Sequence, residues 1–360
     1  MFSFWREMEK NTRTKVLVSL FLLSLFLLDG LPPFLPGPLS AGLATKTQIP
    51  DFFAVTHWLN PETPVTRKSL EGNVVIITFW NFSCLRCIKQ MTFLAAWQKK
   101  YAEKHFQVIT LHTPHYRFEK FPENVEQAIK KLGFPFPVGL DPEGLMWQAY
   151  NRPPRPVYYM VDRRGRIRAT SPENPDYAKE EAVLQDLLRE QGEEITDEID
   201  VKPKKNKEVT GEILFGFRDL SRYGNETKPR AEVPLNFQKP ANLKTGFFYL
   251  SGKWSIGDET ATALKKGCEL AIPFQGARVF LIAGSLRDNI SRAQIVIDGK
   301  ALEKSILGRD TKIENGDGYL EFKDDGPYEV AKNLGGSSDR HLLEITFEDP
   351  DALLYAAEFD

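Results

Sequence analysis

Two cysteines three residues apart, Cys84 and Cys87, form a pattern that can carry redox chemistry. An apolar, β-branched run at 74–80 precedes them and predicts a strand buried on both faces, with a helix beginning at Cys84. A thiol at a helix N-terminus faces unpaired N–H groups, which stabilise its thiolate. The spacing places the second sulfur one turn further along, where the pair can close a disulfide ring. We therefore predict that Cys84 attacks, that Cys87 resolves the mixed disulfide, and that Arg86 adds a positive charge between them.

Two other interpretations of the cysteine pair remain open, a static disulfide and one half of a zinc site. Zinc needs two further ligands, and the candidates near in sequence are His112 and His115, at the end of the next predicted strand. The gap from Cys87 to His112 is longer than a compact zinc finger uses, and such fingers rarely follow a buried strand. The pattern therefore favours a redox dithiol that needs no metal and no other cofactor.

Composition narrows the classes of function. A chain of 360 residues is long enough for two domains, each with its own core. The formal net charge of −2 argues against a protein that binds nucleic acid or acidic substrates by electrostatics. Three cysteines are too few for a disulfide scaffold, and the third, Cys268, is expected to be a small buried hydrophobic residue.

The N-terminal segment has the pattern of an export signal. Basic residues precede an apolar run at 16–28, which has the length of a signal-peptide core and is short for a membrane span. We predict that residues 1–45 are a signal peptide or an uncleaved N-terminal anchor. The remainder is then expected outside the cytoplasm, in the periplasm or cell envelope, where a dithiol meets oxidised partners. The basic residues are Arg6, Lys10, Arg13 and Lys15.

Residues 46–191 alternate strands and helices, which predicts an α/β domain with a central sheet and flanking helices. The segment at 49–72 is expected to cover one edge of the sheet. The strand–helix–strand unit at 74–112 predicts a parallel pair with a right-handed crossover. Asp141 is expected to cap a helix that begins at Pro142. The expected strands are 74–80, 106–112, 136–140, 157–161 and 166–169, and the expected helices are 84–103, 122–132, 142–150 and 177–190.

The composition and the hydrophobic pattern of the sequence change after residue 191. Residues 192–209 are rich in Glu, Asp and Lys, which predicts a solvated linker. Residues 210–360 contain many short apolar or alternating runs separated by Asp-Gly and Asn-Gly turns, which predicts an all-β sandwich of the jelly-roll kind. The expected strands are 247–254, 268–273, 278–283, 294–298, 319–323, 342–348 and 353–358.

These motifs carry a family resemblance. Residues 46–191 resemble the extracytoplasmic TlpA-type branch of the thioredoxin-like family and, more narrowly, the soluble part of DipZ-type proteins. The matching stretches are FWNFSCLRC at 79–87, HTPHYRFEK at 112–120 and RPVYYMVD at 155–162. The Thr-Gly-Glu-Ile start at 210–213 and the strands after it are similar to the carbohydrate-module-like sandwich that follows in DipZ-type chains.

The resemblance implies a thiol–disulfide oxidoreductase and assigns further residues to its site. Pro156 is the implied cis-proline that faces the cysteine motif and presents backbone groups to an extended partner. Arg155 is expected to place a positive charge beside Cys84. Trp80, four residues before Cys84, is expected to support the site without taking part in the reaction. DipZ-type chains also carry a membrane part that passes electrons outward. No multi-span segment is visible in this sequence, so a donor of the DipZ or CcdA type is expected to be a separate protein.

The sequence departs from the family pattern at two positions. Thioredoxins place a buried Asp six residues before the first cysteine, where this chain has Thr78, and many TlpA-type reductases have a Glu where this chain has Gln90. The usual carboxylate proton acceptor is therefore missing at both places. The remaining candidates for proton transfer are His112, His115 and Glu119. Without that carboxylate, and with Arg86 and Arg155 nearby, we predict a lowered pKa for Cys84.

The resemblance favours a reductant of protein disulfides, although the same dithiol run in reverse would oxidise protein thiols. A second hypothesis is a binding module in which the sandwich captures a sugar or a protein and the dithiol is secondary. Its sugar platform would use aromatic side chains that alternating strands more often bury in a core: Trp254, Phe247, Phe248 and Tyr249. A third is a peroxidase of the related fold, against which the close spacing of the two cysteines argues.

Overall fold

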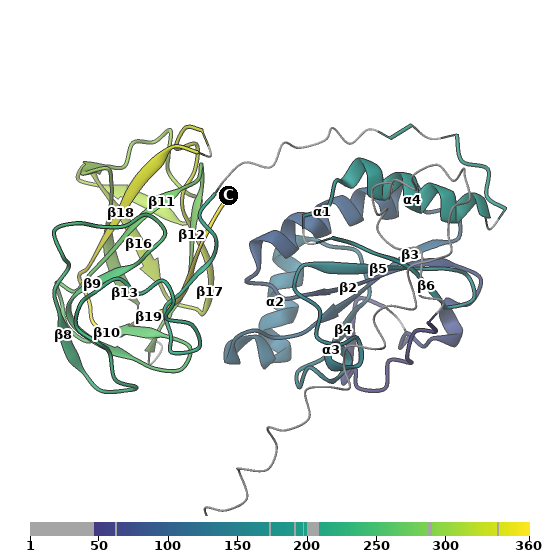
Figure 1. Cartoon of the computed structure of the whole chain (residues 1–360), viewed down its shortest axis with the longest axis horizontal. Helices are drawn as coiled ribbons and strands as arrows, with labels where there is room; N and C mark the ends of the chain where they lie inside the picture. Colours follow the sequence, from purple (N-terminus) through teal and green to yellow (C-terminus); the bar gives the residue numbers. More distant parts are fainter. Residues whose placement is uncertain are drawn as a thin grey trace, which may run out of the picture. The chain divides into compact units, whose positions relative to one another are not determined.

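The protein is described from a computed structural model (Figure 1). The structure describes residues 47–360 except 62, 173, 191, 197, 200–208, 287–289 and 337. The predicted signal peptide or anchor at 1–45 lies outside these residues. Within the described part of the chain, no helix combines the length and the apolar character needed to cross a membrane.

The N-terminal region has the expected α/β class, with helices on a six-stranded sheet whose order is β1-β4-β3-β2-β5-β6. Strands β2, β3 and β4 are parallel, and β5 runs antiparallel to β2. The predicted edge cover is confirmed, because β1 pairs with β4 at the sheet edge. The elements are β1 (His57–Leu59), η1 (Lys68–Leu70), β2 (Val74–Trp80), α1 (Leu85–Lys100), β3 (Phe106–His112), η2 (Arg117–Lys120), α2 (Pro122–Leu132), β4 (Val138–Leu140), α3 (Leu145–Ala149), β5 (Val157–Val161), β6 (Ile167–Thr170) and α4 (Tyr177–Glu190).

Strand β2 is central because all seven of its residues are buried, as its apolar sequence predicts. Alternate side chains point to opposite faces of the sheet. Ile76 and Trp80 belong to the core that α1, α2 and α4 cover, whereas Ile77 and Phe79 belong to the core on the other face, which includes Met146 of α3. Helix packing on both faces holds β2 rigidly, so the loop that leaves its end starts from a fixed position.

Asp141 binds the first turn of α3 as predicted, but the N-cap residue is Gly144, because the helix starts later than expected. Its carboxylate accepts hydrogen bonds from Met146 N at 3.0 Å and Trp147 N at 2.9 Å. The chain first turns at Gly144, which has a φ of +67°, and α3 begins at Leu145. A glycine tolerates this left-handed backbone, so the turn delays the helix that Pro142 was expected to begin.

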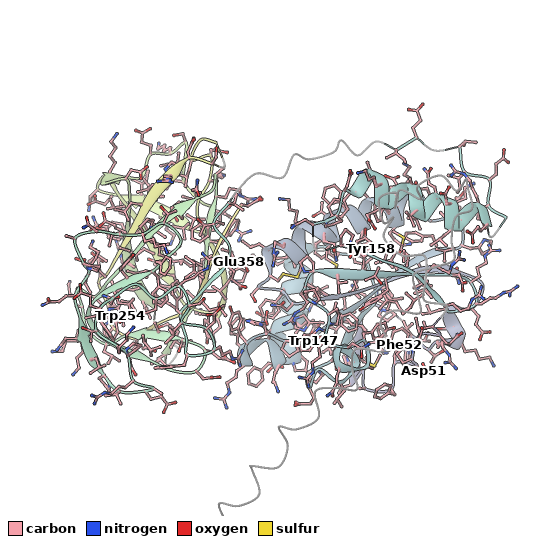
Figure 2. All side chains as sticks on the ribbon, in the orientation of Figure 1. Asp51, Phe52, Trp147, Tyr158, Trp254 and Glu358 are labelled. Atoms are coloured by element: carbon pink, nitrogen blue, oxygen red, sulfur yellow. A yellow bond between two sulfur atoms is a disulfide. The ribbon has the colours of Figure 1, made fainter. Side chains whose placement is uncertain are left out.

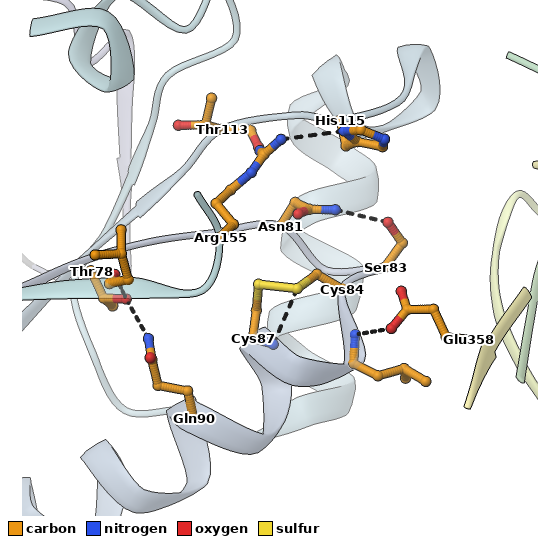
Figure 3. Close-up of a disulfide and its surroundings, with 12 residues drawn as sticks. Thr78, Asn81, Ser83, Cys84, Cys87, Gln90, Thr113, His115, Arg155 and Glu358 are labelled. Carbon is orange, nitrogen blue, oxygen red and sulfur yellow. Dashed lines mark hydrogen bonds between the residues drawn. A yellow bond between two sulfur atoms is a disulfide. The ribbon is translucent and has the colours of Figure 1, made fainter. Parts of the chain in front are cut away.

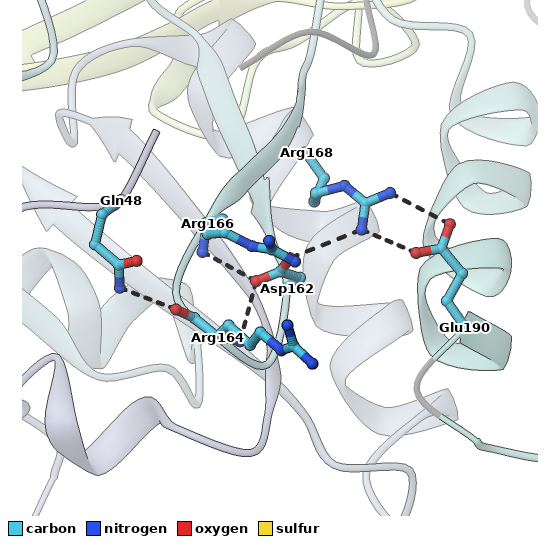
Figure 4. Close-up of polar contacts among 6 residues, drawn as sticks. All are labelled: Gln48, Asp162, Arg164, Arg166, Arg168 and Glu190. Carbon is cyan, nitrogen blue, oxygen red and sulfur yellow. Dashed lines mark hydrogen bonds and ion pairs between the residues drawn. The ribbon is translucent and has the colours of Figure 1, made fainter. Parts of the chain in front are cut away.

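A second buried carboxylate, Asp162, organises the hairpin of β5 and β6 (Figure 4). It accepts hydrogen bonds from Arg164 N and Arg166 N, both at 3.0 Å, and from Arg166 Nε at 2.9 Å. Arg168 lies 3.7 Å from the same carboxylate and 2.8 Å from Glu190 at the end of α4. The network therefore fastens the last helix to the hairpin.

The first residues of the predicted linker are held against the N-terminal region. Ile195 is only 9% exposed and belongs to the core under α1 and α4. Glu193 pairs with Arg163 at 2.8 Å and with His105 at 2.7 Å. This part of 192–209 is therefore anchored where the charge pattern predicted a solvated segment.

The C-terminal region is all-β, as predicted, but its described residues form one nearly closed 13-stranded sheet instead of the two packed sheets of a sandwich. Ten strands follow a single hydrogen-bonded path, and β7, β8 and β14 pair at its side with β19, β9 and β13. Strand β9 connects the part of the sheet that contains β11 to the part that contains β8 and β10. Its first residues pair with β11, and its later residues pair with β8 and β10. Gly252 lies at the change, with a φ of +91° and Cys268 packed against it. The strands are β7 (Ile213–Leu214), β8 (Leu235–Phe237), β9 (Tyr249–Ile256), β10 (Ala261–Ala263), β11 (Glu269–Gln275), β12 (Val279–Ser285), β13 (Ser291–Ile297), β14 (Lys300–Ala301), β15 (Thr311–Glu314), β16 (Asp317–Phe322), β17 (Gly326–Ala331), β18 (Arg340–Phe347) and β19 (Ala352–Phe359).

The aromatic side chains considered for a sugar platform lie mainly in the core of this sheet. Trp254, Phe248 and Tyr249 are buried, and Phe247 is partly buried under the Lys244 ammonium group (Figure 2 labels Trp254). The prediction that these aromatics form core is confirmed for the first three. Cys268 is also buried, as expected, and its thiol donates to Lys253 O at 3.1 Å.

Candidate active site

The cysteine pair lies at the junction of β2 and α1, and its two sulfurs are bonded to each other (Figure 3). Cys84 is the N-cap residue of α1, and its sulfur accepts a hydrogen bond from Cys87 N at 3.1 Å. Cys84 is half-buried, whereas Cys87 is fully buried. Cys84 is therefore the more accessible residue of the pair.

The two positions that lack the family carboxylates are bonded to each other. Gln90 Nε2 donates to Thr78 Oγ1 at 2.8 Å, and that hydroxyl donates to Val157 O at 2.8 Å (Figure 3). Both side chains are fully buried. A neutral hydrogen-bonded chain thus takes the place of an ionisable one beneath the cysteines, and the protein avoids the cost of burying a charge there.

Glu119 is the proton-transfer candidate that the fold brings to the cysteine loop. One carboxylate oxygen accepts from Asn81 Nδ2 at 2.8 Å, from Ser83 N at 3.1 Å and from Ser83 Oγ at 2.6 Å. The other accepts from His115 N at 2.7 Å and Tyr116 N at 3.1 Å. Burial opposes ionisation, but these hydrogen bonds help to lower the pKa of Glu119 below its ordinary value. Its geometry is that of an ionised clamp on the loop before Cys84.

The two histidines occupy different positions around this clamp. The His112 ring is buried, stacked on Phe82 at 5.6 Å and edge-on to Trp80 at 5.3 Å. Burial lowers the pKa of His112 to about 4, against the attraction of Glu119. Burial and the charge of Arg155 likewise lower the pKa of His115 to about 4. Both rings are therefore neutral at pH 7.

Arg155 connects the loop after β3 to the loop before β5. Its Nη1 donates to Thr113 O at 2.5 Å, and its Nη2 donates to His115 Nδ1 at 3.3 Å (Figure 3). Since a guanidinium only donates, His115 accepts through Nδ1 and carries its proton on Nε2. The following Arg155–Pro156 peptide bond is cis, the conformation that the resemblance implies.

The remaining sequence candidates lie close by in the chain. Val157 pairs with Phe79 in the antiparallel register of β5 and β2, which places Pro156 at the end of the sheet where β2 leads into the cysteine loop. Trp80 is fully buried at that end, and Arg86 is exposed in the first turn of α1. In the described part of the chain, no group of three or more His, Cys, Asp and Glu side chains is arranged to hold a metal ion.

One carboxylate at this site was not anticipated from the sequence. Glu358, in the last strand β19, accepts a hydrogen bond from Leu85 N at 3.2 Å (Figure 3). Leu85 directly follows Cys84, so the carboxylate lies at the helix N-terminus that carries the cysteine. The residues are 273 positions apart in the chain, and no local pattern could have related them.

The clamp leads to a first prediction. Replacing Glu119 with glutamine keeps the shape of the side chain but turns one acceptor into a donor that faces other donors. We expect Glu119→Gln to lower the free energy of unfolding by roughly 3 kcal/mol at pH 7. Urea unfolding measures the change, and Glu123→Gln, an exposed carboxylate in the first turn of α2, is the control. Equal stability of the two variants would show that the clamp does not support the fold.

Two family models match the chain. The model described as Redoxin matches residues 44–188, and the model described as Thioredoxin like C-terminal domain matches residues 210–359. The first therefore covers the α/β region with the cysteine motif, and the second covers the β domain that supplies Glu358.

Among individual relatives, Protein DipZ from Mycobacterium tuberculosis is 29% identical over 281 residues, which is 76% of this chain and 39% of DipZ. The chain thus spans about two fifths of the length of that relative. Thiol-disulfide oxidoreductase YkuV from Bacillus subtilis is 26% identical over 124 residues, 34% of this chain and 82% of that protein. Among solved structures, a thiol-disulfide isomerase from Corynebacterium glutamicum is 27% identical with a TM-score of 0.34, covering 37% of this chain and 92% of its own.

Proposed function

We propose that the chain, which is similar to thioredoxin-like oxidoreductases such as DipZ and YkuV, exchanges disulfides through Cys84 as the attacking thiol and Cys87 as the resolving thiol. The observation that carries this proposal is the position of the pair. Both cysteines lie at the start of α1, and only Cys84 is accessible. Helix N–H groups and the dipole stabilise a thiolate at that position.

The reaction moves two electrons and needs no cofactor. In the reduced protein the Cys84 thiolate attacks one sulfur of a substrate disulfide, and the other substrate sulfur leaves as a thiolate and takes up a proton. Cys87 then loses its proton and attacks the Cys84 sulfur, which releases the second substrate thiol. The protein is left with the Cys84–Cys87 disulfide, the form that the structure contains. An external dithiol must return the two electrons before the next cycle.

We further propose that the substrates are disulfides of proteins outside the cytoplasm and that the protein acts as a reductant. The basic and apolar pattern of residues 1–45 supports export or anchoring, and the similarity to DipZ supports a membrane electron donor of the DipZ or CcdA type. The position of Pro156, next to the Val157–Phe79 pair at the end of β2 that leads to the cysteines, supports a role in presenting backbone groups to an extended substrate segment.

The reduction potential of the cysteine pair tests the direction of the reaction. Thiol trapping in dithiol/disulfide buffers of known poise should give a value near or below about −250 mV for a reductant. A value near about −120 mV would instead identify an oxidant that introduces disulfides. A pair that shows no reversible change would contradict the redox function itself.

A further inference from the structure

The β domain brings an acidic side chain to the redox site through more than one contact. Besides the bond from Leu85 N to Glu358, Lys89 Nζ of α1 lies 2.6 Å from Asp360 Oδ1. The ring of Tyr355, on the same strand as Glu358, packs against Tyr116 at 5.1 Å between ring centroids. Strand β19 is thus fastened to the N-terminal region on both sides of Glu358.

Other side chains of the β domain reinforce this contact. Arg218 Nη1 donates to His115 O at 2.5 Å, and Glu259 Oε2 accepts from Arg117 N at 3.1 Å. Both partners lie in the segment that carries Glu119, the clamp on the cysteine loop. The position of Glu358 therefore follows from a set of contacts around the site and not from its own hydrogen bond alone.

The carboxylate of Glu358 and a thiolate at Cys84 draw on the same stabilising groups. The first N–H groups of a helix have no partner within the helix, and they carry its positive partial charge. Glu358 uses the N–H of Leu85, the residue after Cys84, and is only 9% exposed. Two negative charges at one helix end repel each other in a poorly solvated place, so both groups do not ionise freely together.

The side chains of the N-terminal region described above do not supply a carboxylate that can change its protonation together with Cys84. Thr78 and Gln90 are neutral, and the two oxygens of Glu119 are already used by five donors. For Glu358, by contrast, the described residues show one oxygen accepting from Leu85 N at the start of α1. It is therefore the carboxylate best placed to respond when Cys84 changes its charge.

We propose that Glu358 is a positioning residue that couples the ionisation of Cys84 to its own protonation, so that the β domain sets the reactivity of the dithiol. The proposal rests on the proposed function of Cys84 and deepens it. In the coupled step the Cys84 thiol loses a proton and the Glu358 carboxylate gains one. No electrons move, and the total charge at the helix end stays at one negative.

The electrostatic surroundings of Glu358 support this coupling. Burial raises the pKa of Glu358 well above its ordinary value, and the negative charges of Glu212 and Glu119 act in the same direction. The Leu85 N–H and the charge of Arg86 oppose the shift. The carboxyl therefore holds its proton at pH values where an exposed one has lost it. The charged groups around Glu358 are Arg86 and Lys89 on α1, Glu119 on η2, Glu212 before β7, and Asp360 after β19.

The test compares Glu358→Gln with the unchanged chain in the reduced state. Glutamine keeps an oxygen that can accept the Leu85 N–H bond but cannot ionise. The alkylation rate of Cys84 by iodoacetamide, followed from pH 4 to 10, reports its thiolate. We expect the Cys84 pKa to fall by about one pH unit, an approximately tenfold faster alkylation on the acid side of the curve. Glu321→Gln on β16, whose carboxylate pairs with Lys312, is the control and should leave the curve unchanged. An unchanged or raised Cys84 pKa in Glu358→Gln would overturn the proposal.

A measurement on the unchanged chain keeps the proposal testable if the variant does not fold. Coupling is reciprocal, so the Glu358 carboxyl must titrate differently in the reduced and oxidised protein. Carbon NMR of ¹³C-labelled glutamate carboxyls should show a higher Glu358 pKa after reduction, and identical titration curves in the two states would refute the coupling. Neither experiment uses a substrate. A protein that titrates as expected but reduces no insulin would contradict the proposed function and leave the coupling intact.

Discussion

Replacing Cys84 with serine is expected to abolish disulfide reduction, with insulin reduction by the full chain falling by at least about 10³-fold. The reason is that only this sulfur is both accessible and placed at the helix N-terminus, where its thiolate is stabilised. Cys87 is fully buried behind it and cannot substitute in the first attack. The rate of insulin reduction with an excess of dithiol as electron donor measures the loss.

Cys87→Ser provides the complementary result. This variant can make the first attack but cannot resolve it, so a mixed disulfide between Cys84 and the substrate should accumulate and be visible by mass spectrometry. Cys268→Ser is the matched control, because this thiol is buried in the β domain. It should retain full activity. Equal activity losses in all three variants, or a trapped adduct in Cys84→Ser, would contradict the assigned roles.

Local patterns predicted the parts of the fold that depend on neighbouring residues. The buried run of β2 and the helical period of α2 each depend on a few consecutive side chains, and the structure has them where expected. Asp141 does bind the first turn of α3, although the turn at Gly144 moves the start of that helix. Short strands such as β8 and β10 were missed, because three residues carry too little periodicity to indicate a strand. Their pairing with β9 is tertiary, as is the switch at Gly252 that links the two halves of the sheet.

The same distinction applies to the site. The cysteine pair, its helix and the proline before β5 are recognisable from local motifs, and the cis bond at Pro156 agrees with the family resemblance. The absence of a carboxylate at Thr78 and Gln90 could also be seen in the sequence. The carboxylate at the helix end comes from Glu358, near the end of the chain, so its presence depends on how the β domain packs. No spacing rule relates residues brought together only by tertiary contacts.

A second large effect is expected in the pH dependence of stability. His112 is buried in an aromatic environment, and its pKa is lowered to about 4 from the 6.5 of an exposed histidine. Between these values the unfolded chain binds a proton that the folded chain does not, so stability is lost as the pH falls from 6.5 to 4. At about 1.4 kcal/mol for each pH unit, the contribution of His112 amounts to roughly 3 kcal/mol. His115 acts in the same direction.

Other titratable groups also make the folding stability depend on pH. Raised pKa values at Asp141, Glu180 and Glu358 favour the folded state as the pH falls and act against the histidines. The lowered pKa of Glu119 adds its loss of stability only below about pH 4.5, where an unfolded glutamate takes up its proton. The contribution of His112 is therefore isolated by comparing how much stability the wild type and a His112 variant each lose between two pH values.

His112→Phe preserves an aromatic ring beside Phe82 and removes the titrating group. In the oxidised chain, urea unfolding at pH 7 and pH 4 should show that the wild type loses roughly 3 kcal/mol more than this variant on acidification. His57→Phe, at an exposed position in β1, should follow the wild type within about 0.5 kcal/mol. Parallel acid losses in the wild type and His112→Phe would mean that this imidazole is solvated or already charged in the folded state. Its position, stacked on Phe82 and edge-on to Trp80, argues for the opposite outcome, because an imidazolium there would be buried among apolar rings.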